Sequence, residues 1–165
     1  MPSTSVSLLD YLDQVAVVSG GLFAGAALFI TIGEVPAMQE LGVDEHWRFF
    51  PLMYSRAALS QSIFTMSAGL SALAHGFRQV QSRDRNLWFT AGSIFVGMMP
   101  YTIICMLPTN NRIINDNRLI ENGEASQFDQ IARKELLEKW NLLHIGRTVG
   151  SVLAFGLMVY GLSKH

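Results

Sequence analysis

Four long apolar runs dominate this chain and limit what it can fold into. They cover residues 14–33, 52–75, 87–107 and 142–162, and the first and third contain no charged residue. Each is long enough to cross a bilayer, which takes roughly 20 mostly apolar residues. Backbone polar groups in lipid must be paired within the segment, so each run should be a helix. The sequence predicts an all-α integral membrane four-helix bundle, with residues 1–165 forming a single domain.

The composition supports lipid rather than water as the main surroundings. Charged residues make up only 15% of the chain, whereas soluble domains carry about 25%. A soluble four-helix bundle would also show a polar stripe on each helix, which the first and third runs lack. The formal net charge of −1 argues against a nucleic-acid partner. The single cysteine, Cys105, excludes a disulfide framework and a cysteine metal site.

The segment between the third and fourth runs is long and polar. Its first half, PTNNRIINDNRLIENG, is rich in turn-forming residues and predicts a loop. In the second half, apolar residues recur at every fourth position, which predicts a short amphipathic helix. Ser126 and Asp129 resemble the capping box that would begin it. Whether this helix continues into the fourth span stays open. The residues of the apolar stripe are Phe128, Ala132, Leu136 and Trp140.

Orientation and assembly are less constrained. Lys and Arg are densest in the 76–86 loop but more numerous in the 108–141 segment, so two ways of applying the positive-inside rule disagree. We favour both termini in the cytoplasm. Glycines four apart, as in 21–25 and 146–150, predict close helix packing. Ordinary packing within the chain is favoured over a dimer motif, and a homo-oligomer stays open.

Topology gathers the polar residues of the spans at one membrane face. With four spans, the end of the first, the start of the second, the end of the third and the start of the fourth all meet there. Ionisable groups inside a span are costly and usually face a cavity or a partner. We therefore predict a polar pocket open to that face. The residues gathered there include Glu34, Tyr54, Arg56, Gln61, Tyr101, Pro108, Thr109, Asn110, Asn111, Trp140, His144 and Arg147.

Trp140, His144 and Arg147 lie at i, i+4 and i+7 and therefore share one face of the fourth helix. In one interpretation this face contacts a substrate, and His144 accepts a proton, because imidazole titrates near neutral pH. In the other, the three are an interfacial tryptophan, a hydrogen-bonded histidine and an arginine reaching toward water. The spacing alone supports both interpretations equally.

Glu34 and the second helix supply further candidates. Pro36 is expected to end the first helix just after Glu34. We expect Glu34 to pair with Arg56 or Arg147 or to orient His144, with a solvated carboxylate as the alternative. Two other candidates, Tyr54 and Gln61, are seven residues apart on one helix face, where they would bond a ligand or neighbouring helices equally well.

Prolines shape the third span. Pro100 permits a kink that would bring Tyr101 near the pocket. Thr109 and Asn110 would either cap the end of this span or fold over a cavity, and the spacing favours capping.

A metal site built from His46, His144 and Glu34 is not favoured, because no two histidines have the helical spacing of a metal pair.

Four segments carry a family resemblance: FAGAALFITIGEVPAMQELG, MYSRAALSQ, PYTIICMLPTNNRI and WNLLHIGRT. Together they resemble the fungal anthrone oxygenases, which belong to a broader set of small four-helix membrane proteins. The resemblance extends over about residues 14–162. It implies an oxygenase that converts a polyketide anthrone to an anthraquinone with O2 and needs no metal or organic cofactor.

The resemblance also implies roles for individual residues. His144 would act as the base, with Arg147 and Glu34 as the other catalytic groups. The protein would lie in an internal membrane such as the endoplasmic reticulum. Flat rings would stack on the substrate and polar groups would stabilise its developing oxyanion. The alternative function is a non-catalytic membrane binding or accessory protein for aromatic or lipid-like molecules. The expected substrate-binding residues are Tyr54, Gln61, Tyr101, Thr109, Asn110 and Trp140.

Overall fold

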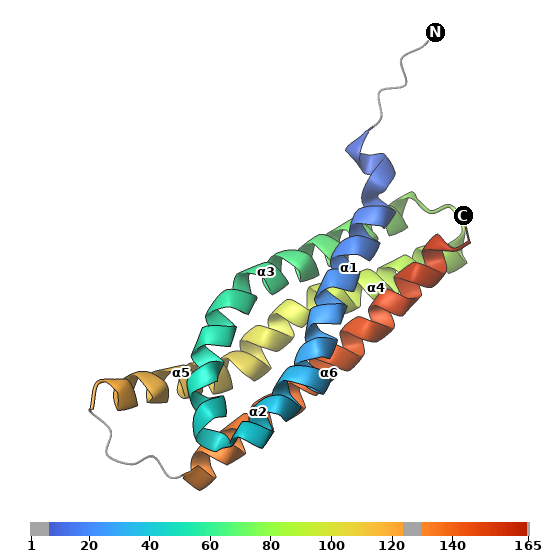
Figure 1. Cartoon of the computed structure of the whole chain (residues 1–165). Helices are drawn as coiled ribbons and strands as arrows, with labels where there is room; N and C mark the ends of the chain where they lie inside the picture. The colour runs from blue at the N-terminus through green and yellow to red at the C-terminus, as the bar shows by residue number, and fades with distance from the viewer. Residues whose placement is uncertain (1–6, 124–129, 165) are drawn as a thin grey trace.

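The computed structural model describes residues 7–123 and 130–164 of the chain. Within them, four helical segments are long and apolar enough to cross a membrane: Leu9–Leu41, Val43–Arg78, Ser82–Glu121 and Gln130–Leu162. They pack side by side as one bundle (Figure 1). Apolar side chains cover the outside, as with Leu59, which is 71% exposed. The predicted all-α class is confirmed, and the architecture is that of an integral membrane protein.

The helical segments are subdivided by short irregular turns. A 3₁₀ turn, η1 (Leu8–Tyr11), precedes the first long helix, and two π-helical turns, η2 and η3, interrupt the first and third spans. In chain order the remaining elements are α1 (Leu12–Phe29), η2 (Ile30–Glu34), α2 (Val35–Leu41), α3 (Val43–Arg78), α4 (Ser82–Tyr101), η3 (Thr102–Met106), α5 (Leu107–Glu121) and α6 (Gln130–Leu162).

Both π-helical turns have a proline as their physical cause. Each ends two residues before a proline, Pro36 for η2 and Pro108 for η3. A proline has no N–H to give the carbonyl four residues earlier, so the backbone widens locally instead of breaking. The expectation that Pro36 ends the helix is wrong. The chain stays helical to Leu41 and turns at Gly42, whose φ of 101° favours glycine.

The loop predicted for the first half of the 108–141 segment is also wrong, because most of it forms α5. Asn117, a turn former in isolation, is buried there and donates to Ile113 O at 3.0 Å and to Trp47 O at 2.9 Å. Ile113 is fully buried in the same contact between α5 and α3. Tertiary packing has therefore overridden weak local propensity.

The second half of that segment is helical as predicted, and it joins the fourth span. From Gln130 onward α6 runs without a break to Leu162. The expected capping box at Ser126 and Asp129, and Phe128 of the apolar stripe, lie outside the described residues. The remaining stripe residue nearest the span, Trp140, is buried against Phe50 of α3.

Two apolar clusters hold the bundle together. One lies toward the end that carries the termini and includes Phe23, Trp88 and Phe95. The other lies toward the opposite end and includes Ile30 and Trp140. A pocket lies where the two clusters meet.

Glycines set the closest helix approaches within the chain. A Cβ added to Gly69 of α3 would lie 2.9 Å from the backbone nitrogen of Val96 in α4. Gly150 of α6 similarly faces Met98, where an added Cβ would lie 2.7 Å from the methyl carbon of the methionine. Small residues at these positions therefore bring backbones together inside the bundle.

Both ends of the described chain lie at the same end of the bundle (Figure 1). Ion pairs link neighbouring segments there, with Arg78 3.3 Å from Asp10 and Lys164 3.5 Å from Asp84. Arg78 also donates to the carbonyl of Leu9. The polar residues predicted to gather at one face lie away from these ion pairs.

Candidate active site

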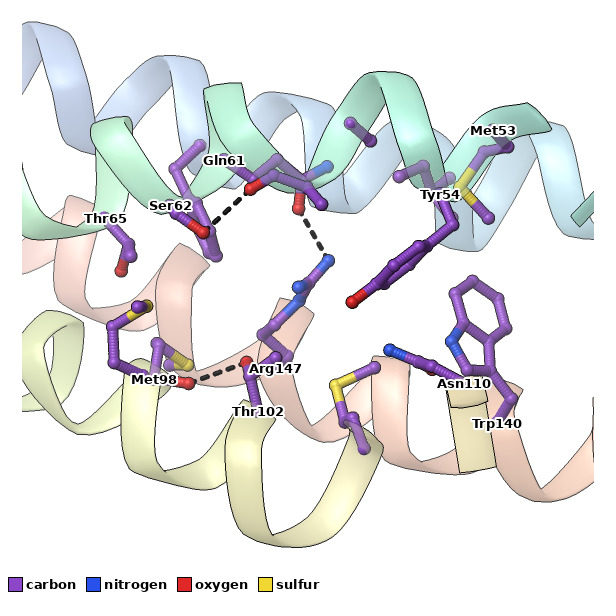
Figure 2. A pocket seen from close by; sticks show the side chains of 16 residues that line it. Met53, Tyr54, Gln61, Ser62, Thr65, Met98, Thr102, Asn110, Trp140 and Arg147 are labelled. Carbon is purple, nitrogen blue, oxygen red and sulfur yellow. Dashed lines mark hydrogen bonds between the residues drawn. The ribbon is translucent and has the colours of Figure 1, made fainter. Parts of the chain in front are cut away.

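A pocket with a cavity volume of about 80 Å³ lies among all four spans. This is below the roughly 300–1,000 Å³ of typical small-molecule sites, so a bound ligand requires lining side chains to move. Its walls come from α1 with η2, from α3, from the α4–η3–α5 segment and from α6 (Figure 2). The lining residues are Phe23, Ile30, Met53, Tyr54, Ala57, Ala58, Gln61, Ser62, Thr65, Met98, Met99, Thr102, Met106, Asn110, Trp140 and Arg147.

Arg147 is the only charged residue in this lining. Its Nη2 donates to Oε1 of Gln61 at 2.6 Å (Figure 2) and lies 3.0 Å from Nε2 of His144. The guanidinium carbon lies 5.4 Å from the centre of the Phe23 ring. Among the described residues no carboxylate forms an ion pair with Arg147, and its Nε is buried without a hydrogen-bond partner. The pocket therefore contains a cation whose charge only neutral groups accompany.

His144 lies directly behind Arg147 and does not line the pocket. Its side chain is fully buried, and its ring stacks at a tilt on Trp140, with centroids 4.9 Å apart. A guanidinium only donates hydrogen bonds, so Nε2 of His144 accepts the bond from Arg147. In this conformation the imidazole therefore does not contact the pocket directly, because the guanidinium of Arg147 lies between them.

Aromatic rings line the end of the pocket nearest α5. Tyr54 is parallel to Phe50 with centroids 6.1 Å apart, and Phe50 meets Trp140 edge to face at 5.1 Å. Figure 2 shows the side chains of Tyr54, Asn110 and Arg147 directed into the same space. Oδ1 of Asn110 is buried without a hydrogen-bond partner. A ligand that donates a hydrogen bond would satisfy this oxygen.

Four methionines form much of the apolar wall: Met53, Met98, Met99 and Met106. Methionine is unbranched and polarisable, and its sulfur makes favourable contacts with aromatic rings. This wall can adapt to a flat aromatic ligand without a change in the backbone.

The structure brings together five of the nine site residues predicted from the sequence. Tyr54, Gln61, Asn110, Trp140 and Arg147 all line the pocket. They come from three different segments of the chain, and their side chains meet as the four-span topology predicts.

The other four predicted residues lie outside the lining. His144 is one layer behind it, and Thr109 is buried elsewhere on α5. Tyr101 donates to the carbonyl of Leu143 at 2.9 Å, so its hydroxyl joins α4 to α6. Glu34 lines a separate surface hollow with Arg56 and, within the described part of the chain, has no ion pair with Arg56 or Arg147. The expected pairing of Glu34 with an arginine is not formed.

Sequence reasoning missed the contribution of the first span. Phe23 and Ile30 line the pocket, and Thr31 lies 3.1 Å from Nδ1 of His144. Nothing distinguished these residues within an uninterrupted apolar run. The usable signal was Pro36, because a proline inside a span marks local irregularity, and π-helical turns often lie at functional sites.

The residues considered for a metal site do not come together. His46 lines another hollow, with Gln39 and Lys134, while His144 is buried beside Arg147. Between residues 7–123 and 130–164 no three His, Cys, Asp or Glu side chains are grouped so as to hold a metal ion.

Comparisons with known proteins point to one family. The sequence profile described as anthrone oxygenase matches residues 50–157. The chain is 29% identical over 138 residues to anthrone oxygenase AgnL2 of Paecilomyces divaricatus, covering 81% of this chain and 84% of that protein. It is 25% identical over 153 residues to an anthrone oxygenase of Claviceps purpurea, covering 86% and 84% of the two chains. No solved structure matches significantly.

Proposed function

The chain belongs to the anthrone oxygenase family, and we propose that it oxidises the methylene of a polyketide anthrone to a carbonyl in the pocket around Arg147. The reaction consumes one O2 and releases one water for each anthraquinone formed. The observation that carries this proposal is the guanidinium of Arg147, which lines an otherwise uncharged pocket and has no carboxylate partner among the described residues.

Arg147 would stabilise the anionic intermediate more than the neutral substrate. Loss of a methylene proton converts the neutral anthrone into an anthrolate, whose negative charge rests largely on the oxygen across the ring. A guanidinium directed at that oxygen stabilises charge that is absent from the ground state, and such stabilisation accelerates the reaction. Gln61 holds the guanidinium at 2.6 Å without neutralising it.

His144 is the base in this proposal. Its Nε2 is an acceptor 3.0 Å from Arg147, so it becomes available for a proton when the guanidinium moves onto the substrate oxygen. The imidazole and the guanidinium would then act on the two ends of one conjugated system. Positioned bases of this kind contribute roughly 100- to 10,000-fold in rate.

The remaining steps need no added reductant. The anthrolate passes one electron to O2, and the substrate radical and superoxide combine to form a carbon–oxygen bond. Protonation gives a hydroperoxide at the former methylene carbon. The second methylene proton then leaves, the O–O bond breaks, and water departs as the carbonyl forms. Both electron pairs come from the substrate, so we propose that no metal or organic cofactor takes part.

The surroundings favour this chemistry. The apolar lining of Phe23, Ile30 and the methionines suits a flat aromatic molecule and O2, since both partition from water into apolar surroundings. We place the protein in an internal membrane such as the endoplasmic reticulum. There, lipid would carry the aromatic polyketide to the pocket.

The test is turnover of an anthrone by purified protein in lipid nanodiscs. We expect quinone absorbance to rise while an oxygen electrode records one O2 consumed per quinone, above the rate of heat-inactivated protein. Arg147→Gln should lower kcat/KM by roughly 100-fold, the typical loss of one oxyanion donor. Arg56→Gln, which removes an arginine outside the pocket lining, is the matched control and should retain activity.

A wild-type rate equal to that of inactivated protein would overturn the proposed oxidation. If such inactive protein still bound anthrones, with Arg147→Gln weakening that binding, the pocket would belong to a non-catalytic binding or accessory protein. Binding is measured independently, by quenching of tryptophan fluorescence, since Trp140 lines the pocket.

A further inference from the structure

Two threonines from different helices meet on the side of His144 that faces away from Arg147. Oγ1 of Thr31 lies 3.1 Å from Nδ1 of the imidazole, and Oγ1 of Thr148 lies 3.3 Å from it. The two hydroxyl oxygens are 2.8 Å apart. Thr148 is 4% exposed, His144 is fully buried, and Thr31 is partly buried.

Backbone carbonyls offer acceptors for the protons of both hydroxyls in this cluster. Both hydroxyls lie within reach of Ala27 O, at 3.1 Å for Thr31 and 3.2 Å for Thr148. Thr148 also lies 3.1 Å from the carbonyl of His144. A carbonyl only accepts, and each hydroxyl has one proton to give. When Thr31 donates to Ala27 O and Thr148 donates to a carbonyl or to Oγ1 of Thr31, lone pairs of the hydroxyls remain to accept from Nδ1.

The contact on the other side of the ring also requires the tautomer with its proton on Nδ1. Nε2 faces the Nη2 of Arg147 at 3.0 Å, and a guanidinium has no acceptor, so Nε2 must be the unprotonated nitrogen. We propose that Thr31 and Thr148 are positioning residues that hold the neutral His144 with its proton on Nδ1 and its lone pair on Nε2, toward Arg147 and the pocket.

This tautomer matters for the reaction, and here the inference rests on the proposed function. A base must present a lone pair to the proton that it removes. With the proton on Nε2 instead, the imidazole would have no lone pair on the pocket side and would face Arg147 with a second donor. After Nε2 takes the methylene proton, Nδ1–H still has the threonine oxygens as acceptors, so the imidazolium is stabilised in place.

Helix packing alone does not require hydroxyls here. Valine has nearly the same shape as threonine and would fill the same space between η2 and α6. It would lack the oxygen that accepts from Nδ1. Threonine-to-valine and threonine-to-serine substitutions therefore separate packing from hydrogen bonding.

The first test reads the tautomer directly and needs no substrate. In protein labelled with ¹⁵N-histidine, the two ring nitrogens of His144 are assigned by their loss in His144→Gln. We expect a protonated Nδ1 and an unprotonated Nε2 in the wild type. In the Thr31→Val/Thr148→Val double variant the Nε2–H form should appear.

The second test is kinetic. The double valine variant should lose at least about 10-fold in kcat, because an imidazole in the wrong tautomer cannot accept the substrate proton. Its KM should stay within about 2-fold of the wild-type value, since neither threonine lines the pocket. The Thr31→Ser/Thr148→Ser variant should recover most of kcat. Thr90→Val, at an exposed position on α4, should match the wild type.

The outcomes separate this inference from the proposed oxidation. An Nε2–H tautomer in the wild type, or a double valine variant with unchanged tautomer and kcat, would overturn the positioning role. Failure of the serine variant to recover kcat would overturn it as well. A wild type with the Nδ1–H tautomer but without turnover would instead overturn the oxidation and support the tautomer assignment.

Discussion

Arg147 and His144 are joined by a hydrogen bond of 3.0 Å between Nη2 and Nε2, and only Arg147 lines the pocket. Their spacing along α6 puts both on one helix face, which by itself does not show which of them meets a ligand. In the structure they are arranged in series, with the arginine in front and the imidazole behind it. Substitutions at His144 therefore change both the position of Arg147 and the base.

Two substitutions separate those effects. In His144→Gln, the amide oxygen can replace Nε2 as the acceptor for Arg147 but cannot act as a comparable base. We expect KM to stay within about 3-fold and kcat to fall by roughly 100-fold or more. His144→Leu removes both functions and should raise KM as well. A His144→Gln variant with nearly wild-type kcat in the oxygen-uptake assay would limit His144 to positioning the arginine.

Charge at Gln61 gives the next prediction. Gln61→Glu would place a carboxylate about where Oε1 now lies 2.6 Å from Arg147, forming a buried ion pair. The pair should preserve the fold, yet it would oppose an anionic intermediate, so we expect kcat/KM to fall by roughly 100-fold. Gln61→Leu should lower kcat/KM by less, because the guanidinium of Arg147 then stays without a carboxylate partner. The exposed Gln14→Glu on α1 is the control for added charge. Greater loss in Gln61→Leu than in Gln61→Glu would contradict this account.

Glu34 should be dispensable for catalysis. It lies in a separate hollow beside Arg56 and does not line the pocket. We expect Glu34→Gln to change kcat/KM by less than about 3-fold, since carboxylates at the surface without a close partner contribute little to stability or to the charge inside a pocket. The measurement is steady-state quinone formation alongside wild type. A 100-fold loss would mean that Glu34 reaches the substrate in a conformation different from this one.

Stability depends on the glycine contact between α3 and α4. A Cβ at Gly69 would lie 2.7 Å from Cγ2 of Val96 and 2.9 Å from its backbone nitrogen. Relieving that overlap requires the two helices to separate, so Gly69→Ala should lower the free energy of unfolding by about 1–3 kcal/mol. Gly97→Ala, with no atom within 4 Å of its added Cβ, should instead stabilise by about 0.5–1 kcal/mol. Thermal unfolding followed by circular dichroism compares the two, and equal shifts would contradict the packing argument.

The spans and the shared polar face were predictable because their causes are local. An uncharged run such as 87–107 has few stable forms in lipid other than a helix. An even number of spans also fixes which helix ends meet. Tyr54, Gln61 and Arg147 followed from that topology and from helical spacing.

The errors arose where packing between distant segments decides the outcome. The turn-rich stretch around Asn117 is helical because its side chain donates to Trp47, 70 residues away. Pro36 widens the helix rather than ending it, because α2 continues to pack beyond it. The role of Thr31 also depends on a partner 113 positions distant. No pattern within a short window of sequence contains these contacts.

The space inside the pocket is the last feature to test, since the substrate must occupy it. Ala58 lines the pocket, whereas its neighbour Leu59 is 71% exposed on the outer surface of α3. In Ala58→Phe the added ring should fill the space that the anthrone needs and lower kcat/KM by at least about 10-fold. Leu59→Phe places a ring of the same size on the lipid-facing side and should retain wild-type activity. Both variants should unfold near the wild-type temperature, because neither ring enters a packed core. If Ala58→Phe oxidised the anthrone at the wild-type rate, the substrate would have to bind outside this pocket, and Arg147 could not stabilise its oxyanion.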